Sequence, residues 1–119
     1  MFKKLREKLY DRKTKKTLES MKFDTFMYYS DSMLPAFVSN KGKDGINTVF
    51  FPETESTFKM AFEKLKKLYF KKTPYEKAKE NIATYCNYYN FSDEVVSYCM
   101  EIFKNNKSEL YNFKGIVKR

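Results

Sequence analysis

The spacing of the aromatic side chains most strongly restricts the folds open to this chain. Twelve Phe and ten Tyr are spread over 119 residues. Phe58, Phe62, Leu65 and Tyr69 follow one another at steps of four, three and four. Steps of three and four place side chains on one face of an α-helix. This segment therefore predicts a helix with a buried aromatic face, capped somewhere in residues 54–57 and running to about Lys71.

Two further helices are predicted after it. The run Thr73-Pro74-Tyr75-Glu76 reads as a capping box with proline at the first helical position, and the helix that it opens should end near Asn90. Ser92 can cap the next helix, with Asp93 and Glu94 in its positive first turn, and that helix should fade at residues 105–106. Residues 57–105 are thus assigned to the C-terminal helices.

The first 21 residues form a basic segment with a narrow apolar stripe, which predicts an N-terminal helix over residues 1–21. A break inside the wholly polar stretch 11–17 remains an alternative. A short helix is expected from about residue 24 to residue 33. The β-favouring runs 36–39 and 46–51, joined by a loop with glycine and Asn/Asp residues, predict one β-hairpin over residues 36–51.

These segments define the expected architecture. The fold class is mainly α (α+β), with four or five helices packed around one aromatic-rich core and a single small β-hairpin. A hydrophobic content of 42% over 119 residues is the amount expected for one core, so residues 1–119 are predicted to form a single domain.

Catalytic and metal-binding constellations are not found in the sequence. Histidine is absent, which removes Ser-His and Cys-His nucleophiles and the commonest metal ligand. Cys86 and Cys99 have no second pair for a zinc site and are expected to be reduced core thiols. The carboxylate pairs Glu53 with Glu55 and Asp93 with Glu94 have simpler structural roles. The chain is therefore expected not to be an enzyme, and no metal, cofactor or small-molecule substrate is assigned.

The net charge of +9 is concentrated in two segments. Residues 1–16 hold eight basic residues against two acidic ones, and residues 63–80 hold seven lysines against three glutamates. Clustered cations gain free energy by releasing counterions from a polyanion, which points to nucleic acid or a nucleoprotein complex. The candidate contact residues are Lys3, Lys4, Arg6, Lys8, Arg12, Lys13, Lys15, Lys16, Lys64, Lys66, Lys67, Lys71 and Lys72.

Simpler interpretations of this charge remain open. With 21 Lys but 3 Arg, part of the excess follows from A/T-rich codons, and scarce arginine argues against sequence-specific readout. The basic stripe could be a solvated helix face, or lie on an anionic membrane, although its apolar side is short and no lipidation signal is present. No membrane partner is assigned. Without a signal peptide or an apolar run long enough to span a bilayer, the expected location is the cytoplasm, or the nucleus in a eukaryotic host.

The aromatic residues suggest a rival function. Tyrosines beside lysines, as at Tyr69-Phe70-Lys71-Lys72, suit either base stacking or a protein interface. The leading hypothesis is a small basic, non-enzymatic accessory or regulatory protein that binds nucleic acid largely without sequence preference. The alternative is a viral or mobile-element interaction protein that binds and inhibits a host protein through an aromatic surface.

Overall fold

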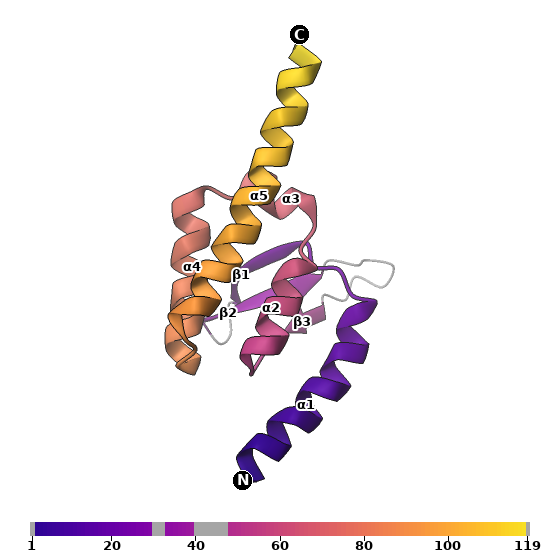
Figure 1. Cartoon of the computed structure of the whole chain (residues 1–119), viewed down its shortest axis with the longest axis vertical. Coiled ribbons are helices and arrows are strands. Elements are labelled where there is room, and N and C mark those ends of the chain that lie inside the picture. The colour runs from indigo at the N-terminus through magenta and orange to yellow at the C-terminus, as the bar shows by residue number, and fades with distance from the viewer. Residues whose placement is uncertain (1, 30–32, 40–47, 119) are drawn as a thin grey trace.

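The computed structural model describes the backbone of residues 2–29, 33–39 and 48–118, and the side chains of residues 5–28, 33–39 and 49–107. The described chain is mostly helical with a small antiparallel sheet, which confirms the predicted fold class. Its elements, in chain order, are α1 (Phe2–Glu19), β1 (Thr25–Tyr29), β2 (Leu34–Ser39), β3 (Thr48–Phe50), α2 (Glu55–Glu63), α3 (Lys67–Lys72), α4 (Tyr75–Tyr89) and α5 (Asp93–Lys118) (Figure 1).

The three strands form an antiparallel sheet in the order β1-β2-β3. Its register places Phe26 opposite Phe37 and Phe37 opposite Phe50, so three aromatic rings lie side by side on one face. The rings of Phe26 and Phe37 stack with centroids 4.5 Å apart. Phe58 of α2 meets both at centroid distances of 5.8 and 5.7 Å. This aromatic layer joins the sheet to the helices and forms the centre of the core.

The rest of the core fills the space between the helices. Cys86 of α4 and Cys99 of α5 are buried in it as free thiols, as predicted. Burial raises the pKa of the Cys86 thiol to about 12, so it stays protonated at neutral pH and is a poor nucleophile. The Tyr85 hydroxyl donates a hydrogen bond to the Pro52 carbonyl, which ties α4 to the segment before α2.

The predicted helix over residues 24–33 is wrong, because Thr25–Tyr29 is strand β1. Along β1 Phe26 is buried and Met27 is 49% exposed, which is the alternation of a strand with one face on the core. β-Branched and aromatic residues favour this conformation. The predicted hairpin over residues 36–51 is therefore part of a three-stranded sheet. Strand β2 begins two residues before the predicted range, and β3 lies inside it. The predicted connecting loop at 40–45 lies outside the described residues.

The helix boundaries differ from expectation at three points. The helix predicted to reach Lys71 is interrupted at residues 64–66 and divides into α2 and α3. The capping box lies at Thr54 and Thr57, whereas Pro74 is the N-cap of α4 and makes no side-chain cap. At the last boundary, α5 continues to Lys118 and does not fade at residues 105–106.

Other expectations for the helices hold. The first helix runs without a break from Phe2 to Glu19. Asn90 ends α4 in the left-handed conformation, at φ 58°, a conformation that asparagine adopts more easily than most residues. Asp93 and Glu94 lie in the first turn of α5, as predicted. The described chain measures 58 × 37 × 26 Å because α1 and the end of α5 extend from opposite ends of the body (Figure 1).

Candidate nucleic-acid interface

Helix α1 is attached to the body along one face. Leu18 is fully buried in the core, and the turn after it is closed by a hydrogen bond from the Met21 amide to the Leu18 carbonyl. Two turns earlier, Asp11 accepts a 2.6 Å hydrogen bond from the Thr54 hydroxyl at the N-terminus of α2. The neighbouring Tyr10 hydroxyl accepts a bond from the backbone amide of Glu53. These contacts fix which face of α1 is turned towards solvent.

The basic side chains of α1 are accessible to solvent. Every described cation of the helix is exposed: Arg6, Lys8, Arg12, Lys13, Lys15 and Lys16. Among the described side chains the ion pairs are Lys66 with Asp24 and Lys77 with Glu80, and neither involves α1. The charges of this helix are therefore not neutralised within the described part of the protein. We call these six side chains the α1 cationic face.

The acidic residues of α1 mostly lie elsewhere on the helix. Asp11 is bonded to Thr54, and Glu7, one turn before it, lines a hollow of about 550 Å³ together with Glu53, Glu55 and the Tyr89–Phe91 turn. Only Glu19, at the C-terminal end, is exposed outside this hollow. Charge is thus partly segregated around the helix axis: Glu7 and Asp11 lie towards α2 and most of the cations do not, although Lys15 borders a second hollow with Glu55, Lys59 and Glu63 of α2.

The apolar stripe of α1 also faces outward. Leu5 and Leu9 are 57% and 50% exposed, and they lie one turn apart among the cations. The sequence could not distinguish this stripe from a buried one. The buried position of α1 is Leu18, which belongs to a different helical face.

The second basic segment begins where α2 and α3 are joined. Phe23 and Leu65 form a parallel bridge, in which the Phe23 amide donates to the Lys64 carbonyl and the Lys66 amide donates to the Phe23 carbonyl, at 3.3 and 2.8 Å. Phe23 and Leu65 are buried. Of the residues beside them, Lys22 is exposed and Lys64 and Lys66 are half-buried, so all three reach the surface.

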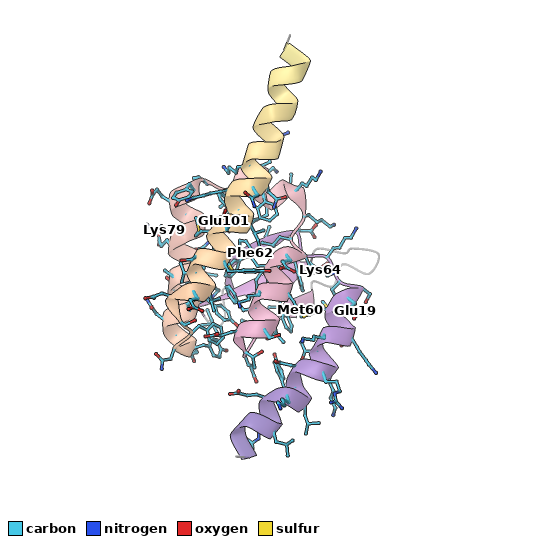
Figure 2. All side chains as sticks on the ribbon, viewed as in Figure 1. Glu19, Met60, Phe62, Lys64, Lys79 and Glu101 are labelled. Carbon is cyan, nitrogen blue, oxygen red and sulfur yellow. The ribbon has the colours of Figure 1, made fainter. Side chains whose placement is uncertain are left out.

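The outward lysines at this junction border a shallow hollow. It has a volume of about 380 Å³ and is lined by Lys22, Glu63, Lys64, Leu65, Lys66 and Lys67. The Lys64 ammonium group donates to the carbonyl of Glu19, the last residue of α1, at 3.4 Å (Figure 2). The hollow therefore lies at the C-terminal end of α1, and we call it the junction hollow.

Helix α3 presents lysines but not aromatic rings. Lys67, Lys71 and Lys72 are exposed, whereas Tyr69 and Phe70 are buried. Burial raises the pKa of Tyr69 to about 12. The suggestion that Tyr69 and Phe70 offer a stacking or interface surface is therefore wrong. Their rings pack on Phe103 of α5 with centroids 6.2 and 5.9 Å away.

The exposed large aromatic side chains in the described ranges are tyrosines: Tyr75, Tyr88 and Tyr98. Lys104 lies over the ring of Tyr75 and Lys59 over that of Tyr98, at 5.7 and 5.1 Å from the centroids. Tyr88 is the most exposed of the three, at 68%, and its ring meets Tyr89 edge-on. The aromatic surface is much smaller than the number of Phe and Tyr residues suggests.

Two carboxylates of α2 have structural partners. Glu55 accepts a 2.9 Å bond from the Ser92 amide, and Glu63 accepts one from the Tyr98 hydroxyl. Among the residues that the structure describes, no three Cys, Asp or Glu side chains come together in a way that could hold a metal ion. In the same residues no helix is both long and apolar enough to cross a bilayer.

Of the thirteen predicted contact residues, eleven have described side chains: six lie on α1 and five in residues 64–72, and three of these five, Lys64, Lys66 and Lys67, line the junction hollow. The side chains of Lys3 and Lys4 lie outside the described residues. Lys66 differs from the rest because its ammonium group lies 2.7 Å from the Asp24 carboxylate. Sequence reasoning missed Lys22, which borders the hollow. No charge cluster surrounds Lys22 in the sequence, and only its pairing with residues forty positions away could reveal its place.

Comparisons with protein-family models, with curated proteins and with solved structures find no match to this chain.

Proposed function

We propose that this chain is a small basic, non-enzymatic accessory or regulatory protein that binds nucleic acid, or a nucleoprotein complex, through the α1 cationic face and the lysines of residues 64–72. The observation that carries the proposal is the segregation of charge on α1. Six cations are exposed and without ion-pair partners in the described chain, whereas Asp11 is bonded to Thr54 on the side of the helix that faces α2.

Such a face suits the phosphate backbone. Exposed cations that neutralise phosphates release condensed counterions, and this term is independent of base sequence. Lysine acts as a flexible point charge, whereas arginine reads guanine with a rigid fork. Only two of the six residues of the face, Arg6 and Arg12, are arginines. We therefore expect binding that depends steeply on salt and weakly on sequence.

The test is a titration of fluorescently labelled duplex DNA, single-stranded DNA and RNA, each of two unrelated sequences, from 50 to 300 mM salt. The logarithm of the affinity should fall linearly with the logarithm of salt, by about 0.9 per phosphate contact on duplex DNA. The two sequences should give nearly equal affinities. No measurable binding at the lowest salt would refute the proposal.

A second candidate function is an interaction protein of viral or mobile-element type that inhibits a host protein through an aromatic surface. The observation that favours it is Tyr88, which is 68% exposed and adjoins the ring of Tyr89, which in turn stacks on Phe91. Aromatic anchors at such interfaces carry much of the binding energy. In this case affinity for the partner should depend weakly on salt and should collapse in Tyr88→Ala, which the nucleic-acid proposal expects to bind normally.

A further inference from the structure

The charge of the junction hollow differs from that of the α1 cationic face. Lys22, Lys64, Lys66 and Lys67 converge on it from two segments, while Glu63 also lines it. Asp24 neutralises Lys66 across 2.7 Å. Four lysines against these two carboxylates leave a net charge of +2 in one hollow.

The backbone arrangement holds these cations in place. The bridge between Phe23 and Leu65 fixes the relative position of the two segments that carry Lys22 and Lys64. Lys64 is further held by its bond to the Glu19 carbonyl at the end of α1. Three of the four ammonium groups, those of Lys22, Lys64 and Lys67, have no ion-pair partner among the described side chains.

The net charge of +2 suits a phosphate monoester better than a phosphodiester. A monoester carries about −1.5 to −2 at neutral pH, whereas each phosphodiester of a strand carries about −1. A monoester also occurs only at the end of a strand, and the hollow lies at one end of the α1 cationic face. We propose that the junction hollow binds the terminal phosphate of a nucleic-acid strand, with the following backbone phosphates along α1.

This inference rests on the proposed function but makes a separate claim. The α1 cationic face should contact any phosphodiester backbone, whereas the hollow should distinguish a phosphorylated strand end from a hydroxyl end. Lysine ammonium groups provide three rotatable donors each, so they can surround a terminal phosphate without a fixed planar geometry. Lys66 is not counted among the residues that contact the terminal phosphate, because its ammonium group is paired with the Asp24 carboxylate.

The experiment compares three single-stranded oligonucleotides of one sequence: one phosphorylated at the 5′ end, one at the 3′ end and one with two hydroxyl ends. Binding is measured at about 50 mM salt for the wild type and the variant Lys22→Gln/Lys67→Gln. The matched control, Lys77→Gln/Lys79→Gln, removes two exposed lysines from α4. Figure 2 shows Lys79 on the opposite side of the body from Lys64.

We expect wild type to bind one of the two phosphorylated strands about five- to tenfold more tightly than the hydroxyl-ended strand, the size expected for two or three exposed charge contacts. The Lys22→Gln/Lys67→Gln variant should lose this difference, and the control should keep it. Circular dichroism and urea unfolding verify that all three proteins fold alike.

The outcomes separate this inference from the proposed function. Equal affinity of the wild type for all three strands, with salt-dependent binding intact, overturns the terminal-phosphate site and leaves the proposed function standing. A preference that survives in Lys22→Gln/Lys67→Gln also overturns it. If none of the three oligonucleotides binds at low salt, both the proposed function and the terminal-phosphate site are refuted. A phosphoserine peptide is titrated under the same conditions, and binding as tight as that of the phosphorylated strand contradicts the assignment to nucleic acid.

Discussion

The hydrogen bond between Asp11 and Thr54 links α1 to the rest of the protein. The Thr54 hydroxyl donates to the Asp11 carboxylate across 2.6 Å and accepts from the Thr57 amide at 3.2 Å, so one side chain attaches α1 and caps α2. We predict that Asp11→Ala and Thr54→Ala are coupled. Loss of either partner should weaken the attachment of the helix that carries the cationic face.

The magnitude follows from the geometry. A hydrogen bond to a charged group contributes about 1.5–3 kcal/mol. Because both side chains here are only partly buried, a value at or just below the lower limit of this range, about 1–1.5 kcal/mol, applies to Asp11→Ala. Thr54→Ala also removes the N-cap, which adds about 1 kcal/mol. The double variant should cost about 1 kcal/mol less than the sum of the two single variants, because the shared bond is lost only once.

Urea unfolding of the four proteins, followed by circular dichroism, measures this coupling. Thr54→Ser is the control, since it keeps the hydroxyl that donates to Asp11 and caps α2. Hydrogen exchange of the α1 amides should rise in Asp11→Ala more than that of α4. Additive free energies, with no coupling beyond a few tenths of a kcal/mol, would show that the contact does not hold α1 in place.

Three further predictions concern the core. The pKa of Tyr69 is raised from 10.0 to about 12 in the folded protein. The protonated phenol therefore contributes its full stabilisation of the fold below pH 10, and up to about 3 kcal/mol of the free energy of unfolding is lost as pH rises to 12. Tyr69→Phe should reduce this loss of stability at alkaline pH. Urea unfolding at pH 8, 10 and 11 checks this, and an unchanged pH profile contradicts it. Cys86→Ser with Cys99→Ser should lower the free energy of unfolding by about 1–3 kcal/mol per site and leave nucleic-acid affinity unchanged, since both thiols are buried. A folded double variant that no longer binds would make the thiols functional. Leu18→Ala should cost about 2–5 kcal/mol in thermal or urea unfolding, and a value below 1 kcal/mol would show that α1 is not anchored there.

Helix α4 was predictable from the spacing of its apolar residues, whereas strand β1 and the break that separates α2 from α3 depend on distant partners and were not. Ala78, Ile82 and Tyr85 set the buried face of α4 by local spacing alone. The sequence predicts a helix at β1 because its aromatic side chains fit either period, and only the pairing of β1 with β2 selects the strand. The break between α2 and α3 contains no glycine or proline. It is fixed by the bridge from Leu65 to Phe23, which is more than forty residues away.

Only part of the candidate site was predictable from the sequence, because the rest depends on contacts between distant residues. Charge counts located the basic segments at 1–16 and 63–80, and the described cations of α1 are all exposed. The sequence did not show that Asp24 neutralises Lys66 or that Lys22 joins the junction hollow, because both facts depend on tertiary pairing. The aromatic surface was overestimated, since most of the described Phe side chains lie in the core.

The most direct test of the central claim compares two variants that lose the same charge in different places. One replaces three cations of the α1 cationic face with Gln: Lys8, Arg12 and Lys16. The other replaces three lysines of α4 and α5 with Gln: Lys77, Lys79 and Lys104. The measurement is the dependence of duplex DNA affinity on salt, from 50 to 300 mM. We predict that the α1 variant loses about two to three units of the log–log slope, at about 0.9 per contact, while the control keeps the wild-type slope. Equal slopes in the two variants would show that only the overall charge matters and would contradict the assignment of binding to α1.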